Sequence, residues 1–256
     1  MSVGLALSGG GMKGIAHIGA IKALEENNIF PTHISGSSVG AIVGAFYASG
    51  YSPEKMVTFF KEVPLFNPNR YGFGKPGLIN TENFYEDFKK YFPEDNFNAL
   101  QKELFITTVD MLNGNMKVFN EGELIMPILA SSAFPGICSP VAINGSLYAD
   151  GGILDNFPIA PLKSNCEHLI GVYVSPLDEI KSENLKYAVD VLQRAIRINF
   201  SNASSLKFSQ CDLLIYPPLS KYGMFDKNHI DEIFNIGYDT AQNKIKQLKK
   251  SSLLFS

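Results

Sequence analysis

A serine between two glycines is the feature of this sequence with the clearest chemistry. The pentapeptide Gly36-Ser37-Ser38-Val39-Gly40 lies between a short apolar run after Pro31 and an alanine-rich helical pattern over 41–49. G-x-S-x-G between a strand and a helix forms a sharp turn that projects the central hydroxyl toward a helix N-terminus. The glycines are needed because a side chain at either position would collide with the neighbouring backbone. We therefore predict that Ser38 is a nucleophile; the alternative is an ordinary turn.

A serine nucleophile needs donors that stabilise the oxyanion formed when it attacks a carbonyl. Gly9-Gly10-Gly11 follows the apolar run Val3–Leu7 and precedes a helical pattern. At such a position several backbone N–H groups can point at one oxygen, and the helix dipole adds to the field. The sequence therefore predicts an oxyanion hole at Gly9, Gly10 and Gly11.

The serine also needs a base that takes its proton. Histidine is the obvious candidate, but none of the four histidines lies in a glycine-rich turn of the kind that carries a catalytic one. They are His17, His33, His168 and His229. Each is more readily explained as a packed or surface residue.

Asp150 is the better candidate for the base. A predicted hairpin arm delivers it, and Gly151-Gly152 leaves its side chain uncrowded. A carboxylate with a reference pKa of ~3.9 is a weak base, so a Ser-Asp pair must desolvate it or hold it very close to the hydroxyl. The alternative is a turn residue that binds its own backbone.

The order of the expected elements favours a mostly parallel sheet. Strand, glycine loop, helix, strand, elbow and helix make a βαβα opening with right-handed crossovers. Ligands of such sheets collect at the carboxyl ends of the strands, where both glycine motifs lie. Further strands are expected at 104–109, 117–119, 142–143, 146–148, 168–174 and 213–216, and further helices at 55–61, 81–91, 124–131, 185–200 and 230–249.

Composition favours one α/β domain over residues 1–256. The chain is 45% hydrophobic and 18% charged, and no proline-rich or single-sign stretch divides it. The formal net charge of -3 argues against broad attraction to nucleic acid. The three cysteines, Cys138, Cys166 and Cys211, lack the spacing of a disulfide framework or a zinc site, so we expect no metal and no cofactor.

The sequence favours a cytoplasmic protein, with peripheral contact at a membrane as a further expectation. The N-terminal segment has no basic leader and reads as a strand, and no uncharged apolar segment reaches ~18 residues. Between 64 and 80 the chain lacks a clear period and carries Phe66, Tyr71 and Phe73. This loop is either a lid over an acyl pocket or ordinary core packing.

The three motifs occur in an order that resembles the patatin-like phospholipases. Gly9-Gly10-Gly11-Met12-Lys13-Gly14 comes first, the Ser38 elbow second and Asp150-Gly151-Gly152 third. The resemblance extends to the segments 108–119, 130–136 and 155–158, and it covers roughly residues 3–175. Beyond that point the C-terminal helices, expected at about 184–250, show little resemblance to the family.

The resemblance implies a three-layer α/β/α domain that uses a dyad without histidine. Ser38 would be the nucleophile, Asp150 the general base, and Gly9, Gly10 and Gly11 the oxyanion hole. The implied reaction is lipid degradation, in which a fatty acyl ester such as a phospholipid or lysophospholipid is cleaved through an acyl-enzyme. An acyltransferase that uses the same acyl-enzyme, and a catalytically silent lipid-binding protein, are the alternatives.

Lys13 departs from the family pattern, which commonly has arginine at this place. Lysine keeps the charge but loses the planar fork of donors. A cation is slightly unfavourable at a helix start, which favours a role near an anionic head group over a solvated surface position.

Two other kinds of site, a dinucleotide-binding site and a P-loop, fit the sequence less well. Gly9-x-Gly11-x-x-Gly14 also satisfies the dinucleotide fingerprint, but the region 32–36, where that fold holds an acidic residue for the ribose, has none. A P-loop fails because no Gly-Lys-Ser or Gly-Lys-Thr follows the glycines. No calcium-loop pattern is present, so we expect calcium independence.

Overall fold

The structure is a computed structural model that describes residues 2–63, 65 and 77–250. Its strands are β1 (Val3–Leu7), β2 (His33–Ser37), β3 (Glu103–Asp110), β4 (Met116–Phe119), β5 (Val141–Ile143), β6 (Ser146–Asp150), β7 (His168–Val172) and β8 (Leu213–Ile215). The described strands form one eight-stranded sheet in the order β5-β6-β3-β2-β1-β7-β8, with β4 also paired to β3. Strands β3, β2, β1, β7 and β8 are parallel neighbours, whereas β4, β5 and β6 pair antiparallel.

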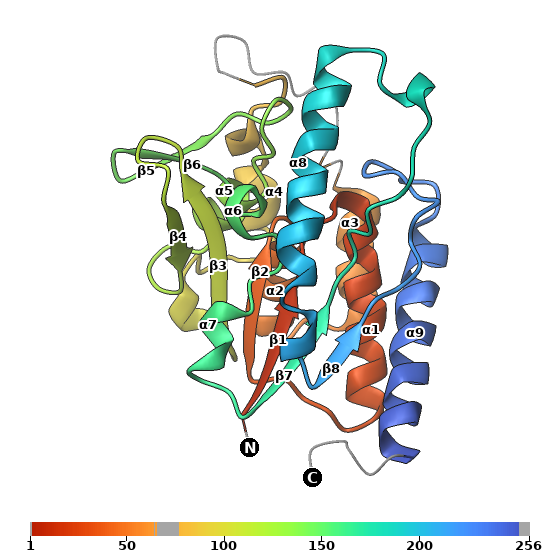
Figure 1. Ribbon diagram of the computed structural model, residues 1–256. Coiled ribbons are helices and arrows are strands. Elements are labelled where there is room, and N and C mark those ends of the chain that lie inside the picture. Colours follow the sequence, from red (N-terminus) through yellow and green to blue (C-terminus); the bar gives the residue numbers. More distant parts are fainter. Residues whose placement is uncertain (1, 64, 66–76, 251–256) are drawn as a thin grey trace.

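Helices lie on both faces of this sheet (Figure 1). They are α1 (Ile15–Glu26), α2 (Val39–Ala48), α3 (Pro53–Glu62), α4 (Tyr85–Lys89), α5 (Ile125–Ser131), α6 (Gly152–Asp155), α7 (Ala160–Lys163), α8 (Ala188–Ser205) and α9 (Ile230–Lys250). Helices α1, α2 and α9 cover one face, and α7 and α8 lie on the other (Figure 1). The predicted α/β architecture, a mostly parallel central sheet between helical layers, is confirmed.

Strand β1 shows how the sequence builds two cores. Alternate side chains of a strand point to opposite faces of the sheet. Leu5 and Leu7 accordingly enter the larger core with α1, α2 and α9, whereas Ala6 enters a smaller core with Phe157 and Tyr173. Because both faces of β1 are covered, the strand is a continuous apolar run and not an alternating one.

Most predicted elements agree with the structure within a few residues. The lid proposed for 64–80 falls mainly on 66–76, so that expectation, together with Phe66, Tyr71 and Phe73, lies outside the described residues. Ile79, just after this segment, forms a parallel β-bridge with Cys138. None of the described helices combines the length and the apolar character needed to span a bilayer.

Candidate active site

Ser38 occupies the turn between β2 and α2 in a strained backbone conformation. Its φ is 55° and its ψ is -128°. Positive φ is uncommon for a residue with a side chain and is maintained only where the surroundings enforce it. A Cβ on Gly36 would lie 2.4 Å from the Gly40 carbonyl oxygen, and one on Gly40 would lie 2.2 Å from the Leu7 carbonyl oxygen. Both glycines are therefore required by the close approach of β1, β2 and α2, as the sequence predicted.

Helix α5 holds the backbone of the elbow. The N–H of Ser38 donates to Oγ of Ser131 at 2.9 Å, and that hydroxyl donates to the Thr107 carbonyl oxygen of β3 at 2.8 Å. Ser131 is fully buried. The relay ties the turn to the neighbouring strand and so fixes the direction in which the Ser38 side chain leaves the backbone.

The register of β3 brings Asp150 to the elbow. Strand β2 pairs with residues 103–107 of β3, where Ser37 lies opposite Thr107. Strand β6 pairs with 108–110, where Asp150 lies opposite Thr108. Since β4 occupies the other edge of β3, β6 continues along the edge where β2 ends. Residues distant in sequence thus meet at the carboxyl end of β2.

The carboxylate of Asp150 is buried, with 1% of the residue exposed. Burial raises its pKa from 3.8 to about 6, and hydrogen bonds from the Gly152 N–H and the Ser38 hydroxyl partly offset that rise. The Gly152 bond, to Oδ1, is 2.8 Å long. The desolvation that a carboxylate base needs is therefore present.

The glycine loop between β1 and α1 presents two free amides. The N–H of Gly9 donates to the Asn156 carbonyl oxygen at 3.1 Å, so this amide is already engaged. Among the described residues, the N–H groups of Gly10 and Gly11 have no such partner. A Cβ on Gly9 would lie 3.1 Å from Cβ of Ser38, which shows how closely the loop approaches the elbow. Gly9 therefore allows the loop to approach the elbow closely, and Gly10 and Gly11 have N–H groups that are available to donate hydrogen bonds.

The histidines lie away from this arrangement. His17 is fully buried in α1, where Nε2 donates to the Ser8 carbonyl oxygen at 2.8 Å. Burial lowers its pKa to about 4, with that hydrogen bond acting in the opposite direction, so the ring stays neutral and supports the glycine loop. None of the described residues that line the pocket around Ser38 is a histidine.

Lys13 is buried, which excludes the solvated surface position. Only 2% of the residue is exposed, and Nζ has no hydrogen-bond partner among the described residues. Burial lowers its pKa to about 8; the nearby Arg197 lowers it further and Asp178 raises it. The chain thus maintains a costly ammonium group close to the elbow.

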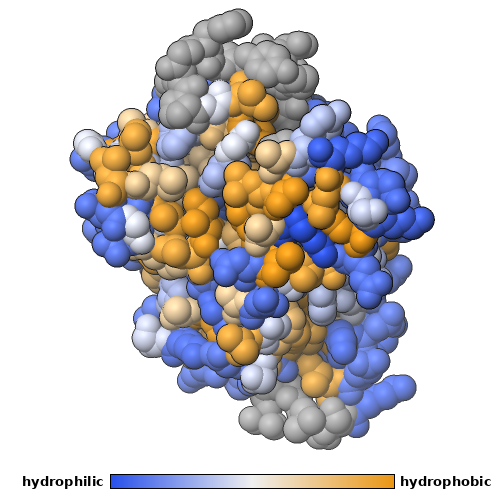
Figure 2. Space-filling model, turned by 45° about the horizontal axis from the view of Figure 1, so that its top comes forward, coloured by the Kyte–Doolittle hydropathy of each residue, from blue (hydrophilic) through white to orange (hydrophobic). Residues whose placement is uncertain are grey.

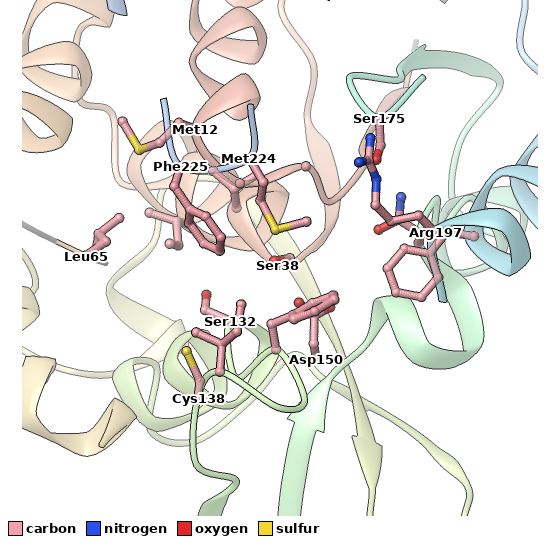
Figure 3. Close-up of a pocket in the computed structure, with 18 of the residues that line it drawn as sticks. Met12, Ser38, Leu65, Ser132, Cys138, Asp150, Ser175, Arg197, Met224 and Phe225 are labelled. Carbon is pink, nitrogen blue, oxygen red and sulfur yellow. The ribbon is translucent and has the colours of Figure 1, made fainter. Parts of the chain in front are cut away.

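Ser38 and Asp150 line one pocket at the carboxyl ends of the parallel strands (Figure 3). Most of the other lining residues are apolar: Met12, Val39, Ile42, Phe60, Leu65, Phe134, Ile137, Phe200, Met224 and Phe225. Apolar side chains also cover much of the end of the molecule that Figure 2 turns forward. Such a pocket suits a hydrocarbon chain next to a polar reacting group. The part of the chain that the structure describes holds no group of three or more metal-ligating side chains.

A family model described as patatin-like phospholipase matches residues 5–163. The chain belongs to the patatin-like phospholipase family. This region contains both glycine motifs, Ser38 and Asp150, so the resemblance seen in the sequence is confirmed. Helices α8 and α9 lie beyond the matched residues.

Patatin-like relatives include much longer proteins. Lysophospholipase NTE1 of Scheffersomyces stipitis is 26% identical over 284 residues, which cover 99% of this chain and 18% of that protein. An uncharacterised NTE family protein of Mycobacterium bovis is 35% identical over 165 residues, which cover 62% of this chain and 45% of that protein. The chain thus spans about a fifth of the length of the lysophospholipases that it matches.

Two solved structures share the patatin-like fold of this chain. VipD from Legionella pneumophila has a TM-score of 0.65 at 15% identity, over 98% of this chain and 66% of that one. The type III effector protein ExoU has a TM-score of 0.51 at 18% identity, over 96% of this chain and 53% of that one.

Several residues of the pocket carry no sequence signal. Ser175 and Arg197 line the pocket, although no motif marks either of them. Ser131, which holds the elbow, was part of the resemblance only as a member of the segment 130–136. Arg197 belongs to α8, outside the region that the family model matches. Asn156 was part of the resemblance only as a connecting segment, yet its carbonyl oxygen binds the Gly9 amide and its side chain lines the pocket.

Proposed function

We propose that the protein is a serine hydrolase that cleaves fatty acyl esters of lipids, with Ser38 as nucleophile and Asp150 as general base. The observation that carries this proposal is a strained serine beside a buried carboxylate, whose pKa of about 6 is poised for proton transfer at neutral pH. The family membership supports the reaction class. The apolar pocket supports a fatty acyl substrate.

The reaction proceeds in two halves. Asp150 accepts the hydroxyl proton of Ser38 as Oγ attacks the acyl carbonyl carbon. When the tetrahedral intermediate collapses, the bond to the alcohol breaks, and Asp150 returns the proton to the leaving oxygen. Asp150 then takes a proton from water, the hydroxide attacks the acyl-enzyme, and Ser38 regains its proton as the fatty acid leaves.

The oxyanion of each intermediate is stabilised by the amides of Gly10 and Gly11. Both lie in the pocket that contains Ser38, and both are free of other partners among the described residues. A missing donor of this kind typically costs about 2.7–4 kcal/mol of transition-state stabilisation. Gly9 was predicted as a third donor, but its amide is bound to Asn156, so we assign it the role of allowing the loop to approach.

The names of the relatives support lysophospholipids as the substrates. The proteins named lysophospholipase match nearly the whole of this chain, although the chain spans only about a fifth of their length. Hydrolysis of a single acyl chain also suits one apolar pocket next to Ser38.

The test is active-site labelling together with product analysis. The purified protein is treated with a fluorophosphonate probe, the adduct is mapped by mass spectrometry, and fatty acid released from a lysophospholipid is measured. We expect the label on Ser38, its loss in Ser38→Ala and a steep fall in Asp150→Asn. Ser37→Ala should keep the label on Ser38; because the Ser37 hydroxyl also lowers the pKa of Asp150, this variant controls the position of the label and not its rate. Labelling of another serine, or equal labelling of wild type and Asp150→Asn, would contradict the assignment.

A further inference from the structure

The pocket around Ser38 has two chemically different ends. Figure 3 shows Leu65 at one end and Arg197 with Ser175 at the other, with Ser38 and Asp150 between them. One end is therefore apolar and the other cationic. An ester held with its carbonyl at Ser38 would direct its two substituents toward these two ends.

A second cavity extends the apolar end. It shares Leu65, Ile42 and Cys138 with the pocket and adds Phe84 and Phe88. No charged side chain is among its described lining residues. The acyl chain would therefore enter this side.

Another cavity extends the cationic end. It shares Arg197 with the Ser38 pocket and adds Arg194, Gln193 and Asn184. Arg197 thus stands between the reacting ester and a polar groove. Asp190 is a carboxylate on the same wall, and its Oδ2 accepts a hydrogen bond from the Tyr187 N–H at 2.9 Å.

Helix α8 buries Phe200 but exposes other apolar side chains, while its two arginines face this groove. Val191, Leu192 and Ile198 are 52%, 54% and 40% exposed. Arg194 and Arg197 are instead partly buried. A helix that served only to cover the sheet would have the opposite arrangement. The inward arginines therefore need an explanation other than packing.

The cations of this region are incompletely paired. Arg197 Nη2 lies 3.8 Å from Asp178 Oδ2, and Arg194 Nη2 donates to the Asp178 carbonyl oxygen at 2.7 Å. Among the described residues, Arg194 Nη1 and Lys13 Nζ are buried without a hydrogen-bond partner. Of the two nearby carboxylates, Asp178 pairs with Arg197 and has its Oδ1 buried without a hydrogen-bond partner among the described residues, whereas Asp190 caps α8. Buried cations without partners are costly, and an anion bound among them would relieve that cost.

We propose that Arg197, with Arg194, forms a head-group site that binds the anionic phosphodiester of a lysophospholipid while its ester lies at Ser38. This inference rests on the proposed hydrolase function. Arginine suits the role because its planar fork can donate two hydrogen bonds to one phosphate group. The site selects phospholipids over neutral glycerides with the same acyl chain.

The test compares two esters that differ only in the head group. Values of kcat/KM are measured for 1-palmitoyl lysophosphatidylcholine and 1-palmitoylglycerol in the same mixed micelles. Arg197→Gln should lower the ratio of the two values by roughly tenfold or more, the size expected when a hydrogen-bonded ionic contact is lost. Lys186→Gln removes the same charge from an exposed position before α8 and should leave the ratio unchanged.

A second variant separates binding from structure. Asp178→Asn removes the same ion pair as Arg197→Gln but keeps the cation. If the arginine acted only through that ion pair, both variants would lower the ratio equally, which would overturn the proposal. Preservation or increase of the ratio in Asp178→Asn supports it.

A competition arm separates a head group from free phosphate. Glycerophosphocholine should inhibit hydrolysis of 1-palmitoylglycerol by wild type, and Arg197→Gln should weaken that inhibition. Inhibition by inorganic phosphate alone would overturn the head-group assignment. Hydrolysis of neither ester by wild type would overturn the proposed function, whereas hydrolysis of both with an unchanged ratio in Arg197→Gln would overturn only the head-group site.

Discussion

The carboxylate of Asp150 accepts a 2.8 Å hydrogen bond from the N–H of Gly152, two residues further along the chain. A turn residue that binds its own backbone was the ordinary alternative to a catalytic aspartate, and Asp150 makes such a bond while also facing Ser38. The hydrogen bond from Gly152 orients one carboxylate oxygen, and the pairing of β6 with β3 places the carboxylate next to Ser38. The structural and the catalytic interpretation of this residue are therefore compatible.

The pH dependence of activity follows from Asp150. The base must be charged to accept the Ser38 proton, and burial raises its pKa to about 6. We expect kcat/KM to be constant at neutral pH and to fall about tenfold per pH unit below pH 6. A profile with a soluble acyl ester, on enzyme shown by circular dichroism to remain folded, measures this. Activity that stayed constant down to the reference pKa of aspartate would contradict a buried base.

Asp150 also predicts a cost in stability. Its pKa is raised from 3.8 to about 6 in the folded state, so the folded protein binds the proton more tightly than the unfolded chain. This contribution favours folding below pH 3.8 and is lost as the pH rises through 6. Removing the charge should therefore raise the free energy of unfolding at pH 7, by up to about 3 kcal/mol for Asp150→Asn.

Urea unfolding of wild type and Asp150→Asn at pH 7 and at pH 4 measures the effect. The gain in the free energy of unfolding should be smaller at pH 4, because the wild-type carboxyl is then protonated in the folded state. A variant less stable than wild type at pH 7 would show that the carboxylate has stronger favourable contacts than its burial indicates.

The glycines of the elbow give a steric prediction. A Cβ on Gly40 would lie 2.2 Å from the Leu7 carbonyl oxygen and 2.8 Å from that of Ser8, so the backbones of α2 and β1 would have to separate. We expect Gly40→Ala to lower the free energy of unfolding by more than about 2 kcal/mol. The matched control is Gly223→Ala, where a Cβ would meet no atom within 4 Å. Equal thermal stability of the two variants would contradict the close approach.

The elbow and the glycine loop could be predicted because each depends on residues that are neighbours in the sequence. The elbow needs glycine within two residues of Ser38, and the loop needs glycines between β1 and α1, so short motifs record both. The position of Asp150 next to Ser38 depends on β6 pairing with β3 beyond the end of β2. That register is set by many weak contacts, and only the family resemblance, not the motif itself, indicated it.

The cationic end of the pocket was not predictable in this way. Arg197 lies in α8 and lines the same pocket as the buried Phe200, whereas hydrophobic periodicity alone would place a charged residue of this helix in solvent. Lys13 lies in a motif, but the motif does not indicate that its side chain is buried. Ser131 lies in the segment 130–136 of the family resemblance, but its hydrogen bond to the Ser38 amide depends on the packing of α5 against the elbow and could not be predicted from the segment itself.

Lys13 gives the last prediction, which concerns stability. Burial, with Arg197 nearby, lowers its pKa from 10.5 to about 8, so the fold disfavours the charged form. The full cost is present below pH 8 and disappears as the pH rises toward 10.5, so Lys13→Met should raise the free energy of unfolding at pH 7 by up to about 3 kcal/mol. The gain should be smaller at pH 10, and the exposed Lys186→Met should show none. If Lys13→Met were destabilising at pH 7, the ammonium would have a favourable partner in the folded protein, which would contradict this prediction.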